Sequence, residues 1–134
     1  MEDPPQGWPR ISSSVFYDDA KAAIDWLTDA FGFEAQLKVE EQGQIVHSQL
    51  TFDGGLIMVG QARLTKERPF CKSPSSVAGA NTQALSVFVD DVEAHCEQAR
   101  RAGAVIAAEP TTQDYGPDYW ADRSYEAVDP EGHH

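Results

Sequence analysis

An internal repeat is the feature of this sequence that most restricts its fold. The hexapeptide Ser14–Asp19, Ser-Val-Phe-Tyr-Asp-Asp, recurs as Ser86–Asp91, Ser-Val-Phe-Val-Asp-Asp. Each copy is followed by a stretch of helical periodicity and then by a glycine, Gly32 in the first copy and Gly103 in the second. A repeated order of strand, helix and glycine predicts two modules built to one design.

Each copy is expected to begin as a β-strand. In the first copy Val15 and Tyr17 share one face and Ser14 and Phe16 share the other, because side chains alternate along a strand. The second copy alternates in the same way over Leu85–Val89. We expect the apolar face of each strand to pack on the helices and the other face to line a concavity.

An aspartate pair separates each strand from its helix. Asp19 and Asp91 are predicted N-caps, whose carboxylates accept the free backbone N–H groups of the first helical turn. The first helix is predicted to run to about Phe31 and the second to about Ala102. The glycine after each helix suits the left-handed conformation that commonly ends a helix.

The remaining elements complete an α+β fold. Three strands are predicted after the first helix, at about Glu34–Glu40, Gln44–Phe52 and Leu56–Gln61, and two after the second, at about Val105–Glu109 and Tyr119–Asp129. The sequence therefore predicts two βαβββ modules with curled mixed sheets, the second lacking its last strand. Within one domain of 134 residues, module one spans about 10–61, a joining loop 62–82, and module two about 83–134.

Charge and composition exclude several classes of protein. With 22 acidic and 10 basic residues the net charge is −12, which argues against nucleic acid or an anionic membrane as the partner. No apolar run reaches the roughly 18 residues of a membrane span, and the N-terminus is not typical of a signal peptide. Cys71 and Cys96 are too few for a disulfide framework, so we expect a cytoplasmic protein.

The motifs, in this order, resemble a known superfamily. They are Val15–Asp19 running into Ala23–Leu27 and Phe31–Phe33, then Phe88–Val92, Gly103-Ala104, and Arg123–Tyr125 through Asp129–His133. The chain is similar to the vicinal oxygen chelate superfamily, which includes glyoxalase I, extradiol dioxygenases and bleomycin resistance proteins. The likeness is strongest to small glyoxalase-like and bleomycin-resistance-like proteins, whose pattern continues past Asp-Pro-Glu-Gly-His into a final strand.

The resemblance implies a place for a divalent metal, held by one His, Gln or Glu from each of four strands. Transferred to this sequence, the first position falls on Ser12 and its counterpart in the second half on Ala84. The third falls near Met58–Gln61, where Gln61 is the polar candidate, and the fourth lies beyond His134. Serine hydroxyl and alanine methyl groups are not ligands of such a metal. We therefore predict no metal, no cofactor and no catalytic residue at this place.

A concavity without a metal still suits a small organic molecule, with aromatic walls and a few polar anchors. The predicted ligand-binding residues are Ser12, Phe16, His47, Gln49, Phe88, Trp120, Arg123 and Tyr125. Structural alternatives stay open: Phe16 and Phe88 as core filling, and His47 as a hydrogen-bonded strand histidine. For Arg123 the alternative is an ion pair with Asp129 or Asp122.

Two further segments bear on the ligand. Tyr115, Tyr119 and Trp120 could form an aromatic lip that attracts flat or cationic ligands, or they could pack against another subunit. The joining loop concentrates four of the ten bases, Arg63, Lys66, Arg68 and Lys72. This basic segment could contact an anionic ligand or an acidic patch of a second subunit, or be a solvated loop.

The leading hypothesis is a metal-free, homodimeric glyoxalase-like protein that binds a small organic ligand in a cleft. The alternative is a metal-dependent lyase, isomerase or dioxygenase of the same superfamily with displaced ligands, in which His47 acts with a residue beyond His134. A third hypothesis, a non-catalytic interaction module, predicts a filled cleft. Of the other histidines, we expect His95 to be structural and partly exposed, and His133 to be a native residue.

Overall fold

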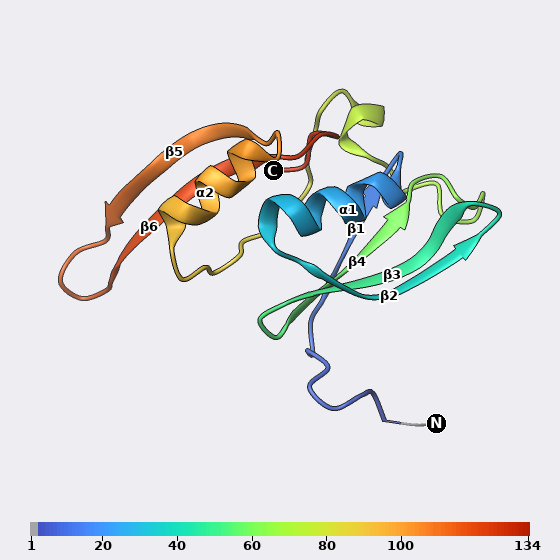
Figure 1. The fold of residues 1–134 in the computed structure, drawn as a ribbon, viewed down its shortest axis with the longest axis horizontal. Coiled ribbons are helices and arrows are strands. Elements are labelled where there is room, and N and C mark those ends of the chain that lie inside the picture. The colour runs from blue at the N-terminus through green and yellow to red at the C-terminus, as the bar shows by residue number, and fades with distance from the viewer. Residues whose placement is uncertain (1–2) are drawn as a thin grey trace. The chain divides into compact units, whose positions relative to one another are not determined.

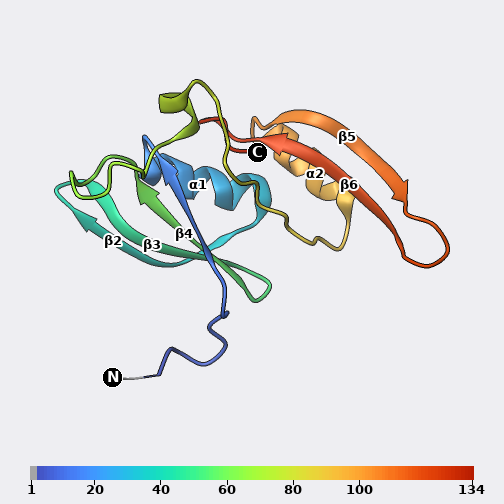
Figure 2. The ribbon, with the colours of Figure 1, turned by 180° about the vertical axis from the view of Figure 1, so that it is seen from behind.

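A computed structural model describes residues 3–134, and the chain divides into two compact units (Figures 1 and 2). Unit one comprises the chain up to Thr28 together with Gly32–Ser73, and unit two comprises Asp29–Phe31 together with Pro74–His134. Among the described residues, no helix combines the length and the apolar character that crossing a membrane requires. The α+β architecture with mixed strand directions confirms the predicted fold class.

Unit one contains a four-stranded mixed sheet. Its order is β1 (Ser13–Tyr17), β4 (Gly55–Gln61), β3 (Gln44–Phe52) and β2 (Glu34–Glu41) (Figure 1). β1 runs parallel to β4, and the other neighbours are antiparallel. The sheet therefore follows the predicted order of strand, helix and three strands, with the last strand inserted next to the first.

Helix α1 (Ala20–Phe31) begins and ends where the sequence predicts. The Ala22 amide donates to the Asp19 carboxylate at 3.0 Å, which caps the first turn. At the other end Gly32 takes φ 82°, and its amide donates to the carbonyl of Thr28 at 3.1 Å. A left-handed φ costs glycine little because it has no Cβ. The last turn, Asp29–Phe31, groups with unit two.

Tight turns set the register of the unit-one hairpins. Gln42 and Gly43 have φ values of 51° and 77°, and Asp53 and Gly54 have 42° and 85°. Two successive positive φ values are typical of the turns whose twist matches that of paired strands. The core of unit one is then built from side chains of α1, β1, β3 and β4, among them Val15, Tyr17, Ile24, Leu27, Ile45, Leu50, Ile57 and Val59.

Unit two contains less regular structure. A short 3-10 helix, η1 (Pro74–Val77), precedes α2 (Val92–Arg101), β5 (Val105–Asp114) and β6 (Ala121–Val128). β5 and β6 form a two-stranded antiparallel sheet. β5 extends five residues past the predicted end at Glu109, and it passes Pro110 at a shift in register, where the missing N–H of proline is tolerated.

The strand predicted at Leu85–Val89 is absent from the structure, in which residues 83–89 have no regular secondary structure. The cause is the lack of a neighbour. In unit one β1 is hydrogen-bonded to β4 alone, and in the described part of unit two no strand follows β6 to take the equivalent place. Without such a partner, the main-chain groups of 85–89 have no ladder to join.

Candidate functional site

The sheet of unit one has a core face and a second face that carries the predicted ligand-binding residues. Val15 and Tyr17 of β1 are buried, whereas Phe16 between them is half-buried. On β3 Ser48 and Leu50 are buried, and the alternate residues His47, Gln49 and Thr51 are half-buried. This second face, on which Phe16, His47 and Gln49 lie, is called the Phe16 face below. Ser12, also half-buried, lies just before β1.

The ring of Phe16 lies against a glycine of the neighbouring strand. Phe16 pairs with Gly60 in the β1–β4 ladder. A Cβ added at Gly60 would approach Cε1 of Phe16 to 3.4 Å and Cδ1 to 3.5 Å. Glycine therefore leaves the space that the phenyl ring occupies.

His47 and Gln49 are the polar groups of this face. Their Nε2 atoms are 3.0 Å apart, so the Gln49 amide donates to His47 Nε2, which requires a neutral imidazole with its proton on Nδ1. β3 pairs with β4 at Leu50–Ile57, Thr51–Leu56 and Phe52–Gly55. The Phe16 face thus presents an aromatic ring, an imidazole and an amide from the strands of one sheet.

A buried serine joins the two central strands farther along β3. Ser48 Oγ donates to the carbonyl of Val59 at 2.5 Å and accepts from the Val59 amide at 3.2 Å. The hydroxyl thereby supplies both a donor and an acceptor to β4. The bridge between Ser48 and Val59 links β3 to β4 beyond the paired residues Leu50 and Ile57.

Arg68 is a component of this face that the sequence did not assign to the site. Its Cζ lies 5.9 Å from the ring centroid of Phe16 and 5.5 Å from that of Phe70, both within cation–π range. Sequence analysis placed Arg68 in a basic segment that could meet an anionic ligand. The sequence could not indicate that the joining loop returns this guanidinium to the ring of Phe16, 52 residues earlier.

Gln61, the polar candidate for a metal ligand on β4, is engaged elsewhere. Its Oε1 accepts from the Ala20 amide at 3.2 Å, and its Nε2 donates to the carbonyl of Asp18. The side chain therefore ties the end of β4 to the start of α1. Within residues 3–134, no three His, Cys, Asp or Glu side chains are grouped in a way that could hold a metal ion.

In unit two, Arg123 and Tyr125 contact α2. Arg123 donates to the Glu93 carboxylate and, at 3.1 Å, to Thr112 Oγ1. Tyr125 Oη is 2.7 Å from His95 Nδ1. Both side chains therefore lie on the helix side of β6, a placement that differs from the predicted one, and their part in ligand binding stays a prediction. The partner of Arg123 is neither Asp122 nor Asp129, and Asp122 Oδ1 is buried without a hydrogen-bond partner.

His95 has hydrogen-bond contacts at both ring nitrogens. Nε2 donates to the carbonyl of Phe31 at 2.9 Å, and Nδ1 lies 2.7 Å from the Tyr125 hydroxyl. Burial, with a smaller contribution from Cys96, raises the pKa of Tyr125 to about 12. Burial also raises the pKa of the Cys96 thiol, against the opposing effect of Arg100. His95 is thus structural, as expected, and the two neighbouring groups stay protonated near neutrality.

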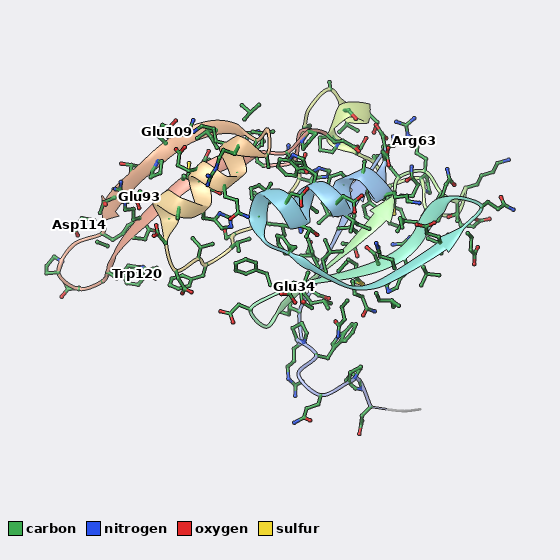
Figure 3. All side chains as sticks on the ribbon, viewed as in Figure 1. Glu34, Arg63, Glu93, Glu109, Asp114 and Trp120 are labelled. Carbon is green, nitrogen blue, oxygen red and sulfur yellow. The ribbon has the colours of Figure 1, made fainter. Side chains whose placement is uncertain are left out.

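The other aromatic candidates of unit two are exposed. Trp120 packs edge-on against Tyr119, which in turn packs edge-on against Tyr115, in the loop between β5 and β6 (Figure 3). Phe88 is 80% exposed. Neither Phe88 nor Trp120 is core filling within its unit, and no described contact brings these two rings together.

The turn after β6 is well connected. Asp129 is buried, and its carboxylate accepts from the amides of Glu131 at 3.0 Å and His133 at 2.9 Å. The His133 imidazole also lies 3.1 Å from this carboxylate. Asn81 donates to the carbonyl of Gly132 at 2.9 Å. His133 is therefore an integral part of the turn.

Comparison with known proteins identifies the family. Residues 10–134 match the model of the glyoxalase/bleomycin resistance protein/dioxygenase superfamily, and the chain belongs to this superfamily. No curated protein matches the sequence significantly.

Solved structures give the same fold. TioX from Micromonospora sp. ML1 is 26% identical, with 93% of each chain covered and a TM-score of 0.65. A superfamily member from Sphaerobacter thermophilus is 17% identical over 90% of this chain and 88% of its own, with a TM-score of 0.67. A glyoxalase/bleomycin resistance protein from a Streptomyces species is 18% identical over 91% and 92%, with a TM-score of 0.59.

Proposed function

We propose that this protein binds a small organic ligand on the Phe16 face, without a catalytic metal, and that it does so as a cytoplasmic homodimer. The observation that carries the proposal is the composition of this face, on which the half-buried ring of Phe16 lies over Gly60 and the His47–Gln49 pair supplies polar groups. An apolar wall with a few convergent polar groups is the usual composition of a small-molecule site.

The chemistry of the face supports binding rather than metal catalysis. Both ends of the Gln61 side-chain amide are bonded to backbone groups at the start of α1. His47 is then the side chain on the Phe16 face that could ligate a metal. A single imidazole holds a divalent metal weakly compared with the three or four protein ligands of known sites. The family also contains proteins named for resistance to bleomycin, a small molecule.

Two other features support a second copy of the chain, rather than nucleic acid, as the macromolecular partner. The net charge of −12 disfavours nucleic acid, which requires a basic surface. Unit two exposes the large apolar side chains of Phe88, Tyr119 and Trp120, and exposed apolar groups of this size are typical of surfaces that contact another protein. A second copy of the chain is the partner that the proposal names.

A thermal-shift screen of a small-molecule library tests the proposal, because ligands that bind the folded state raise its melting temperature. We expect hits with the wild-type protein that are lost in Gly60→Val, whose side chain would displace the ring of Phe16, and weakened in Gln49→Leu. Thr51→Val, an isosteric change on the same face of β3, is the control and should keep the hits. Hits that survive Gly60→Val would contradict the assignment of the site.

Metal analysis of the same protein separates this proposal from the metal-dependent alternative. We expect the ligand-induced shifts to persist after treatment with a chelator. Stoichiometric zinc, nickel, iron or manganese, whose removal abolishes ligand binding, would overturn the metal-free proposal and favour a lyase, isomerase or dioxygenase.

A further inference from the structure

We propose that the ligand of the Phe16 face carries a planar anion, a carboxylate or a group of similar shape, and that Arg68 binds it. The inference rests on the proposed function, because it names the chemical class of ligand for the same site. It depends on three observations: the aromatic rings beside the Arg68 guanidinium, the lack of an acidic partner for Arg68 among the described residues, and the other side chains of the Phe16 face.

Aromatic rings hold the guanidinium of Arg68 in place. The Cζ atom is within cation–π range of Phe16 and of Phe70. Rings contact a guanidinium through its flat faces, so its N–H groups, which lie in the plane, stay available. Five N–H donors in a fixed plane match the two oxygens of a carboxylate, which binds them in pairs.

Within the part of the chain that the structure describes, Arg68 differs from three other arginines in having no acidic partner. Arg63, Arg100 and Arg123 each form an ion pair, with Asp18, Glu109 and Glu93 respectively. No Asp or Glu within residues 3–134 pairs with Arg68. In a chain with 22 acidic residues, a guanidinium held by rings alone retains its capacity to bind an external anion.

The surroundings of Arg68 specify the rest of the ligand. The half-buried ring of Phe16 suits a flat apolar body next to the anion. His47 Nδ1–H and the remaining groups of the Gln49 amide suit a polar substituent farther along. A cationic ligand is disfavoured on this face, because it would have to approach the guanidinium that already lies over Phe16.

Three probes of one shape and different charge test the inference: 2-naphthoate, 2-naphthamide and 2-naphthylmethylammonium. Isothermal titration on the full chain should give the tightest binding for naphthoate, by at least tenfold over the amide. Charge-assisted hydrogen bonds are worth more than neutral ones, so Arg68→Met should weaken naphthoate roughly tenfold to a hundredfold. The same variant should change naphthamide binding less than about threefold, since a neutral amide gains little from the charge.

Matched variants isolate the part of Arg68. Lys66→Met removes the same charge two residues away, on a side chain with no described contact, and should leave naphthoate binding within about threefold. Arg68→Lys keeps the charge but loses the planar fork, and should fall between wild type and Arg68→Met. If Arg68→Met does not fold, the wild-type protein at high salt serves instead, where naphthoate should weaken and naphthamide should not.

The experiments distinguish failure of the anion inference from failure of the proposed function. Equal binding of naphthoate and naphthamide, or a preference for the ammonium probe, would overturn the anion inference and leave the proposed function intact. Naphthoate binding that Lys66→Met reduces as much as Arg68→Met would overturn the role of Arg68. If no probe binds and the screen of the wild-type protein yields no hits that depend on Gly60, the proposed function fails and this inference fails with it.

Discussion

The two units begin with almost the same sequence and differ in what that sequence forms. Ser-Val-Phe-Tyr becomes the greater part of β1 in unit one, where β4 lies beside it, whereas Ser-Val-Phe-Val at 86–89 forms no strand in unit two. The aspartate pair that follows behaves identically in both units and caps a helix through its second carboxylate. A helix cap is a local interaction, but a strand needs a neighbour that the rest of the chain must supply.

The same difference extends to the cores. Unit one buries large side chains such as Ile24, Leu50 and Val59. The buried apolar residues of unit two, among those described, are Ala30, Pro74, Cys96, Ala99 and Ala104, most of which are small. A segment without regular secondary structure and a core of small groups bury little apolar surface, so we expect unit two to open more readily than unit one.

The largest expected effect on the free energy of unfolding comes from truncating a buried side chain of unit one. The comparison is the equivalent truncation within 85–89. Leu50→Ala should lower the free energy of unfolding by about 2–5 kcal/mol, because it removes buried methyl groups and leaves a cavity. Val87→Ala, at a position that is 39% exposed, should stay within about 0.5 kcal/mol of wild type. Urea denaturation measures both, and a comparable loss in Val87→Ala would mean that 83–89 is packed after all.

Supplying the missing neighbour should make the two units more alike. A copy of Gly55–Gln61 appended after His134 places a β4-like strand at the end of the turn that Asn81 anchors, two residues before Gln83. We expect backbone hydrogen exchange across 83–89 to slow at least tenfold, because the amides gain ladder partners.

The control for that extension carries proline in place of the middle residue of the appended strand. Proline lacks the N–H and interrupts a ladder, so this version should leave exchange at 83–89 unchanged. Equal protection by both extensions, or by neither, would show that the absence of a neighbouring strand is not what separates the two units.

The helix caps should show no such difference between units. Asp19→Ala and Asp91→Ala each remove a carboxylate that accepts one backbone amide at 3.0 Å. Each should cost about 1 kcal/mol of stability, as caps usually do. Thermal or urea unfolding of the two variants side by side measures the costs, and a cap worth several times more in one unit would contradict a purely local role.

The last comparison concerns the alkaline behaviour of Tyr125. Its pKa rises from 10.0 to about 12 in the folded state, so the unfolded chain loses the phenolic proton first. The stability that this group contributes is complete below pH 10 and is lost as the pH rises from about 10 to 12. The stability difference between wild type and Tyr125→Phe should therefore shrink over this range. A difference that does not change with pH would show that Tyr125 ionises alike in both states.

The site was partly accessible from sequence. Strand alternation identified the face that Phe16, His47 and Gln49 share, because one buried face requires every second residue to turn away from it. Alternation places Arg123 and Tyr125 on one face of β6, and this face contacts α2 through Glu93 and His95. No local pattern indicated which face of β6 turns toward the helix.

The sequence by itself determined the features that are stabilised by interactions between residues close in the chain. These features are both helices, their aspartate caps, the glycine after each helix and the two tight turns of unit one. Tertiary structure alone decided which repeat became a strand, which way β6 faced, and that Arg68 lay against Phe16. Those outcomes depend on contacts between residues distant in the chain, and the free energy of such contacts exists only after the chain has closed the intervening loops.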